Sequence, residues 1–433
     1  MSSVADRSAV PTTKTQLALA IPAIVVGVVS ALILYGLDEL SGVVQSGIWS
    51  SLPQLLGVDP ASPWWIFAVL SLTGLAVGLA LWLVPGHGGR DSATTELIAP
   101  PLPLVTLPSL ALVTVLGLAG GVSLGPENPI IAINTGILVA LIAKLWPKVP
   151  PALVVMTTAA ATIGALFGTP VAAALVFTGV VGSFSAGGAI WDRLFLPLVA
   201  AGAGTITMTL LAHTELSLTL PAYNTIAPID LLSASVIAFV AAVLGVLGAS
   251  VFSAAHRGFR LLRNPVFYVT LGGALLGILG AIGGPVTMFK GLAQMGDLVA
   301  HRDDYAVGQL TLIVLVKIVA LIIAAAAGFR GGRIFPSVFI GVAIGVLANA
   351  LIPDVPLTIA VSAGALGMVL AVARDGWIAL FIAVALTGGV VVLPVLCIAV
   401  LPSWLVVSRA PEMIVHGKTE ATPQPDAATI AAR

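Results

Sequence analysis

The sequence has few charged residues and almost no cysteine. Only 8% of its 433 residues are charged, and 18 acidic residues balance 18 basic ones. A chain without net charge has no overall attraction for nucleic acid, so no nucleic-acid partner is predicted. The single cysteine, Cys397, excludes an intrachain disulfide framework and a cysteine-rich metal site, and no cofactor is predicted.

Apolar side chains are what the sequence has in abundance. Hydrophobic residues make up 59% of the chain, and the mean hydropathy is +1.13. Folding in water could not bury so much apolar surface, so we expect a multi-pass membrane protein with the lipid bilayer as its main partner. Because backbone groups in lipid must be satisfied within the segment, the fold class is predicted to be all-α.

Many of the apolar runs are short. Several fall below the roughly 20 residues that a full crossing needs, and glycines or prolines interrupt them, which predicts broken or re-entrant helices. The runs cover about 16–36, 64–84, 107–122, 127–146, 151–181, 194–212, 229–254, 267–288, 308–327, 334–352, 356–373 and 376–408.

Composition divides the chain into five parts. The polar N-terminus carries Arg7 and Lys14 and lacks the apolar core of a cleaved signal peptide, so it is placed in the cytoplasm. Asp38, Glu39 and Asp59 are predicted to lie in an acidic loop. The C-terminal tail is polar and is predicted to be disordered. The parts are a cytoplasmic N-terminus (1–15), a first membrane repeat (16–212), a loop (213–228), a second membrane repeat (229–408) and a disordered tail (409–433).

Two glycine-rich segments repeat one pattern. GVSLGPENP begins at Gly121 and GFRGGRIFP begins at Gly328, and three matching positions keep one register (328 − 121 = 332 − 125 = 336 − 129 = 207). In each copy a small-residue helix ends, a glycine break follows, and a new helix starts near a proline, which the first helical turn favours. The echo predicts duplicated halves that each start a helix inside the membrane.

Two such helix starts predict an anion site. The start of a helix carries unpaired N–H groups and about half a positive charge, and transporters with inverted repeats build their sites from such ends. Glu127 follows the first break. As an ionisable group in an apolar stretch it predicts a gate, since its carboxylate can occupy the anion site and leave it when protonated. The alternative is a carboxylate that caps a helix at the membrane surface.

The same motifs resemble those of the CLC chloride channel and transporter family. GVSLGPENP resembles the family's G-x-E-G-P segment, FRGGRIFPSVFIG its G-x-F-x-P segment, and PGHGGRD its G-S-G-x-P segment, with departures at Asn128, Ile334 and Arg90. The resemblance implies many tilted and re-entrant helices in two inverted repeats. It also implies a homodimer in the cell membrane, the bacterial inner membrane, with a pore for chloride or another small anion in each subunit.

The resemblance assigns residues to the pore. Glu127 falls on the gating glutamate, and the backbone of Arg333 and Ile334 falls on the amides that hold the central anion. His87 falls where the family has a serine, and Trp404 where it has a tyrosine. The predicted anion-binding residues are His87, Gly125, Glu127, Asn128, Gly332, Arg333, Ile334, Phe335 and Trp404.

Two positions bear on the mechanism. Family members that exchange protons often carry an internal glutamate where this chain has Val180, and Pro126 replaces the arginine that commonly precedes the gate. Without the internal carboxylate, passive anion conduction is predicted, and proton-coupled antiport of chloride or fluoride is the alternative. Arg330 and Arg333 could attract anions or could pair with an acid such as Asp375.

Other chemistry is less well supported. GVSLG also matches the G-x-S-x-G elbow of serine hydrolases, with Ser123 as nucleophile, but the strand-turn-helix setting of that elbow is missing. None of the five histidines has a sequence context that places it opposite the serine. The adjacent pair Asp303 and Asp304, like Asp91 and Glu96, is predicted to be a set of loop charges rather than a metal site.

Overall fold

The computed structural model describes residues 13–182, 190–212 and 216–415. The described residues form helices joined by short connections, and the sole extended pairing among them is an isolated bridge. The predicted all-α fold class is therefore confirmed. The predicted cytoplasmic N-terminus falls almost wholly on residues outside the described ranges, as does the predicted tail beyond residue 415.

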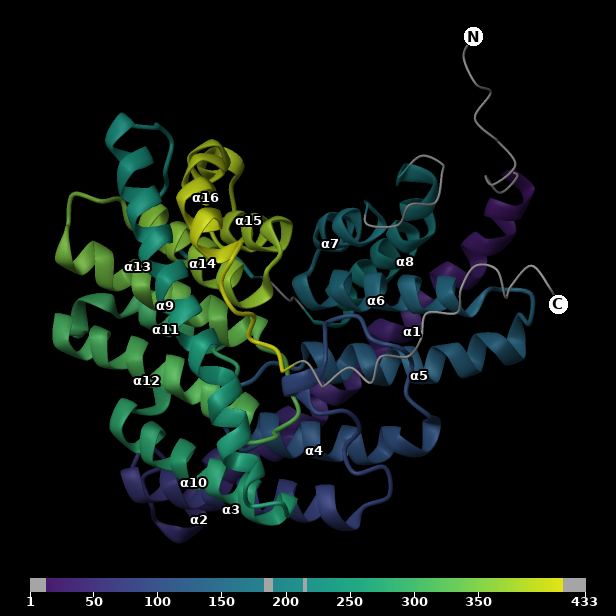
Figure 1. Ribbon diagram of the computed structural model, residues 1–433, viewed down its shortest axis with the longest axis horizontal. Coiled ribbons are helices and arrows are strands. Elements are labelled where there is room, and N and C mark those ends of the chain that lie inside the picture. The colour runs from purple at the N-terminus through teal and green to yellow at the C-terminus, as the bar shows by residue number, and fades with distance from the viewer. Residues whose placement is uncertain (1–12, 183–189, 213–215, 416–433) are drawn as a thin grey trace.

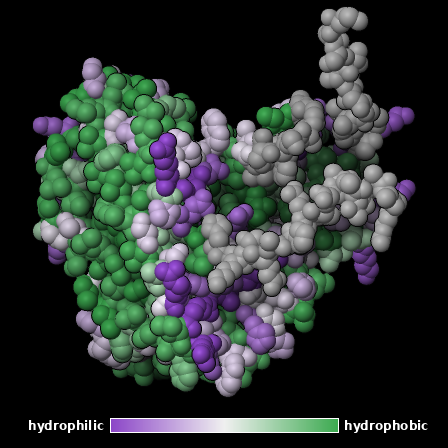
Figure 2. Space-filling model, in the orientation of Figure 1, coloured by the Kyte–Doolittle hydropathy of each residue, from purple (hydrophilic) through white to green (hydrophobic). Residues whose placement is uncertain are grey.

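The helices have the length and composition of membrane spans. Within the described ranges, nine are long and apolar enough to cross a bilayer, and five shorter apolar helices lie among them. Large apolar side chains remain exposed on their outer faces. Figure 2 shows hydrophobic residues covering most of the side formed by the second half, while hydrophilic residues gather in a band near the middle of the view. This surface suits lipid better than water.

The helices fall into two series of seven in the described chain. The first series is α1 (Thr13–Ser46), α3 (Pro63–Leu83), α4 (Leu107–Ala119), α5 (Glu127–Leu145), α6 (Pro151–Phe167), α7 (Pro170–Gly182) and α8 (Ile190–Leu211). The second is α9 (Pro228–Arg260), α10 (Pro265–Gly283), α12 (Val307–Ala326), α13 (Ile334–Leu351), α14 (Leu357–Ala373), α15 (Gly376–Ala385) and α16 (Leu393–Val407). Two short helices, α2 (Leu52–Leu56) and α11 (Leu292–Ala300), have no partner in the other series.

Packing repeats from one series to the other. Helix α1 contacts α4, α6 and α8, and α9 contacts α12, α14 and α16 in the same way. The halves join where α3 packs against α10 and α7 against α15, so equivalent helices meet (Figure 1). Helix α4 ends at Ala119 and α12 at Ala326, which keeps the spacing of 207 positions (326 − 119). The predicted duplication is confirmed by these matched neighbours.

The apolar run over 151–181 is divided into two helices, α6 and α7, because the chain turns at Gly168. Two expectations from the sequence need correction. Asp38 and Glu39 lie within α1 instead of an acidic loop, and the Asp38 carboxylate pairs with Lys290 at 3.0 Å. The predicted disordered tail begins too early, because residues 409–415 are described and Met413 among them is buried.

The junction between the halves depends on close backbone approach. A Cβ atom added at Gly273 of α10 would lie 2.5 Å from the Leu70 carbonyl oxygen and 2.8 Å from the Gly74 Cα on α3. A side chain of any size would force these two helices apart.

We therefore expect Gly273→Ala to destabilise the protein by about 1–3 kcal/mol, the usual range for overpacking. Gly36→Ala is the matched control, since nothing lies within 4 Å of the added Cβ on α1. Thermal unfolding in detergent measures both. Equal melting temperatures for the two variants would contradict the close-packed junction.

Candidate functional site

The two glycine breaks meet inside the protein. Gly125 donates its N–H to the Gly332 oxygen at 2.9 Å, and Gly332 donates to the Gly125 oxygen at 2.6 Å, in an antiparallel bridge. These residues are equivalent in the repeat, so a mutual exchange of hydrogen bonds places a local two-fold axis between them. Because equivalent segments run in opposite directions there, the repeats are inverted.

Each break uses a backbone conformation that favours glycine. Gly121 has φ +91° and Gly328 has φ +88°, both in the left-handed region at equivalent positions. They turn the chain away from the ends of α4 and α12. Six residues later in each copy α5 and α13 begin, at Glu127 and Ile334, so the starts of the two helices lie on either side of the Gly125–Gly332 bridge.

The Glu127 carboxylate binds the start of the opposite helix. Its Oε1 accepts a hydrogen bond from the Phe335 N–H at 2.8 Å, and the residue is only 1% exposed. The unpaired N–H groups at the start of α13 are the donors to which an anion would bind. This carboxylate is buried and bonds the start of another helix, unlike an exposed carboxylate that caps its own helix.

The carboxylate fits a slot left by two glycines. A Cβ atom added at Gly125 would lie 2.1 Å from the Glu127 Oε2, and one at Gly332 would lie 2.0 Å from the same atom. This oxygen has no hydrogen-bond partner among the described residues. The absence of side chains at both positions is thus a condition for the observed position of Glu127.

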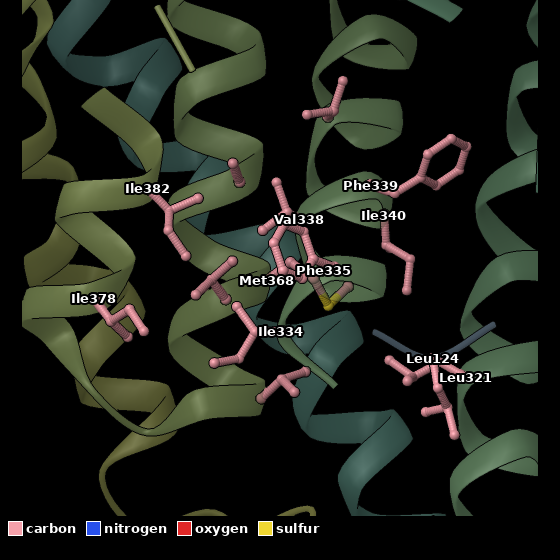
Figure 3. Packing of buried hydrophobic residues seen from close by; sticks show 14 of the residues in the cluster. Leu124, Leu321, Ile334, Phe335, Val338, Phe339, Ile340, Met368, Ile378 and Ile382 are labelled. Carbon is pink, nitrogen blue, oxygen red and sulfur yellow. The ribbon is translucent and has the colours of Figure 1, made fainter. Parts of the chain in front are cut away.

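Apolar packing fixes the amides that face the carboxylate. Ile334 and Phe335 of α13 are buried, and the Phe335 ring stacks on Phe167 with centroids 5.6 Å apart. Figure 3 shows Phe335, Val338 and Met368 gathered in one cluster of buried side chains. A rigid wall of this kind keeps the N–H groups oriented whether or not an anion is bound.

A cavity of about 480 Å³ opens beside this site. Asn128, Arg333 and Ile334 line it, and so do three acidic residues, Glu96, Asp375 and Glu412. Arg333 interacts electrostatically with both Glu127 and Glu412. The cavity therefore brings solvent-accessible charged groups close to the buried carboxylate. The chain that follows α16 forms part of its wall through Glu412, Met413 and Ile414.

A partly buried charge cluster supports the second break. Asp91 pairs with Arg260, with His256 at 3.1 Å and with Arg330 at 3.4 Å. Burial would raise the pKa of Asp91, but His256, Arg330 and Arg260 together lower it below its usual range. The carboxylate therefore stays ionised into acid, and the cluster weakens only when the pH falls through this lowered pKa.

This cluster corrects one interpretation of the sequence. Asp91 is a pairing partner of Arg260, His256 and Arg330 and not an isolated loop charge. Arg330 does pair with an acid, but that acid is Asp91 and not Asp375, whose Oδ1 accepts hydrogen bonds from Trp377 and Ile378 at the start of α15.

Two predicted pore residues do not line the cavity beside Glu127. The His87 ring donates through Nδ1 to the Leu81 carbonyl at 2.8 Å, and Trp404 is 44% exposed on α16. Neither lines the cavity that contains Asn128 and Arg333. The remaining predicted residues, Gly125, Glu127, Asn128, Gly332, Arg333, Ile334 and Phe335, come together around the two helix starts.

Sequence reasoning missed two residues near the breaks. Lys317 lies within α12, is fully buried, and donates to the carbonyls of Thr287, Met288 and Phe289 at 2.8–2.9 Å. A lone lysine in an apolar run was a signal that could have identified it. Ser92 accepts a hydrogen bond from the Gly331 N–H at 2.9 Å, a long-range contact without a local signal.

The site lacks the arrangement of a serine hydrolase. Ser123 is buried, and its hydroxyl has no hydrogen-bond partner in the described chain. His87, His256 and His301 bond other groups, and His213 and His416 lie outside the described residues. A serine nucleophile needs a base within hydrogen-bond reach.

Comparisons with known proteins agree with this geometry. Residues 75–408 match a family model described as voltage gated chloride channel. The chain is 44% identical over 413 residues to YfeO of Escherichia coli O6:H1, named as an ion-transport protein, and the match covers 95% of this chain and 98% of the relative. A relative of the same name from Shigella boydii serotype 4 has the same identity and coverage.

Solved structures share the fold at low identity. A slow cyanobacterial Cl⁻/H⁺ antiporter has a TM-score of 0.76 at 19% identity, covering 90% of this chain and 94% of its own. A CLC-type fluoride/proton antiporter has a TM-score of 0.70 at 18% identity, covering 93% and 98%. The predicted fold is confirmed by both.

We expect Gly125→Ala to displace the Glu127 carboxylate. All three atoms nearest the added Cβ belong to that carboxylate, the flexible end of its side chain, so it would move while the backbone stays. Labelling by a hydrophobic carbodiimide, read by mass spectrometry, should increase several-fold at Glu127. Gly117→Ala, which adds a methyl group into open space on α4, is the control. Unchanged labelling in Gly125→Ala would show that the slot does not hold the carboxylate.

Proposed function

Because the chain belongs to the voltage-gated chloride channel family, the CLC family, we propose that it carries a small anion through the point where α5 and α13 start. Membership of this family makes the chain a multi-pass ion-transport protein and not an enzyme. The hydrolase hypothesis built on Ser123 is therefore rejected. The proposed anion is chloride or fluoride.

One contact carries the proposal, the hydrogen bond from the Phe335 N–H to the Glu127 carboxylate. A carboxylate is itself an anion, so its position marks where the backbone N–H groups of Ile334 and Phe335 would hold a transported anion. Gly125 and Gly332 leave the space, and Arg333 and Asn128 stand at the adjoining cavity. In a site closed to bulk water such contacts are stronger than in solution.

The proposed gate works by competition. An ionised Glu127 occupies the N–H groups and excludes an anion by occupancy and by repulsion. A protonated Glu127 loses its charge and binds these donors less strongly, so an anion can replace it. The proportion of open sites then rises as the pH falls.

Anion flux should follow this protonation. In proteoliposomes, chloride efflux from the unmodified protein should increase as pH is lowered, by up to about tenfold per pH unit while the carboxyl group is mostly ionised. Glu127→Gln, which has no charge to lose, should carry chloride at a rate that does not depend on pH. Asp303→Asn, in an exposed pair with Arg302, is the control. Absence of chloride flux at every pH would contradict the function, and pH-independent flux in the unmodified protein would contradict the gate.

Two mechanisms fit this proposal, passive anion conduction and proton-coupled anion exchange. Passive conduction follows from Val180, which stands where proton-exchanging relatives often carry a glutamate. A specific feature favours proton-coupled exchange as a second candidate. Glu96, Asp375 and Glu412 line the cavity beside Glu127, and burial raises the pKa of Asp375. Glu412 also interacts with Arg333, the neighbour of the gate, so it is the best placed proton carrier. Two of the structures of similar fold are of antiporters.

Glu412→Gln distinguishes these two candidates. If exchange operates, chloride leaving proteoliposomes should draw protons inward, and Glu412→Gln should abolish most proton uptake while chloride flux remains. Glu39→Gln, at an exposed position on α1, is the control. Chloride flux without proton movement in the unmodified protein would support passive conduction instead.

The assembly and the membrane follow from the family alone. We propose a homodimer in a bacterial inner membrane, each subunit with its own pathway. Chemical cross-linking in native membranes would test the dimer.

A further inference from the structure

A second cavity lies near Glu127. Its volume is about 340 Å³, and it is lined by Lys290, by residues at the start of α11 and by residues 216–218. It shares no lining residue with the cavity that contains Arg333. Lys290 interacts electrostatically with Glu127, as Arg333 does from the first cavity. Each cavity is thus lined by one cation that interacts with Glu127.

Lys290 has one competing partner. Its Nζ lies 3.0 Å from the Asp38 Oδ1 of α1, and the two side chains are 28% and 46% exposed. An ion pair this exposed is weak and is screened by salt. The ammonium group can therefore exchange Asp38 for a mobile anion in the cavity at little cost.

Hydrogen bonds fix the backbone that precedes Lys290. The Lys317 ammonium group donates hydrogen bonds to the carbonyls of Thr287, Met288 and Phe289, the three residues before Lys290. The Phe289 N–H in turn donates to the Gly121 carbonyl at 3.0 Å, inside the first glycine break. These contacts fix the base of the Lys290 side chain relative to the gate while its end stays exposed.

We infer that Lys290 captures the anion in this second cavity, before the anion replaces the Glu127 carboxylate, and that Asp38 competes with the anion for Lys290. The inference rests on the proposed function and adds a binding residue outside the two helix starts. The ligand is a small monovalent anion. An ammonium group is a compact point charge without the planar fork of a guanidinium, so it suits a spherical halide.

Chloride kinetics in proteoliposomes test this role. Lys290→Gln should raise the half-saturating chloride concentration several-fold at low ionic strength and leave the maximal rate nearly unchanged. Asp38→Asn should lower that concentration, because it frees the ammonium group. Adding an impermeant salt should reduce both differences, since screening acts on a charge and not on a folding defect. Lys290→Arg keeps the charge but not the compact ammonium group, so it should raise that concentration less than Lys290→Gln does. Arg302→Gln, in an exposed pair, is the control.

The outcomes separate this inference from the function on which it rests. No chloride flux in the unmodified protein would overturn the proposed function. Normal flux with an unchanged half-saturating concentration in Lys290→Gln would overturn only the role of Lys290. If Lys290→Gln does not yield folded protein, Asp38→Asn decides, because an unchanged or raised half-saturating concentration there contradicts the competition.

Discussion

The hydrogen bond between the Phe335 amide and the Glu127 carboxylate is the constraint around which the rest of the protein is arranged. It requires two helices from different halves to start beside each other inside the protein. It also requires that no side chain fill the space at Gly125 and Gly332. A buried carboxylate with one oxygen unpartnered among the described residues is costly, and the proposed role in anion transport would account for that cost.

The duplication of the backbone explains how two helix starts come to face each other. Equivalent residues bridge at Gly125 and Gly332, equivalent helices pack at α3 and α10, and the local two-fold axis passes through both contacts. Each half alone would leave a helix start exposed to lipid, with N–H groups unpaired. Facing each other, the two starts share one polar site that apolar helices enclose.

Features that depend on neighbouring residues were predicted from the sequence. Contacts between residues far apart in the chain were not. Glycine breaks, prolines at helix starts and the spacing of 207 positions depend on neighbouring residues, so the two helix starts and Glu127 were identified. The Asp91 cluster joins residues up to 239 positions apart, and no periodicity encodes which acid a buried arginine will meet. His87 and Trp404 were placed by resemblance, where motif departures had already changed the side chains, and neither lies in the cavity beside the gate.

The symmetry of the backbone is not matched by its charges. Glu127 corresponds to Ile334, Pro126 to Arg333, and the buried Lys317 to Leu110, all at the same spacing. The backbone of the two halves is therefore two-fold symmetric, whereas the arrangement of charged side chains on it is not. Along the proposed anion pathway, the two ends would thus present different charges on one shared backbone scaffold. Any preference for one direction of flow would then come from the side chains and not from the course of the helices.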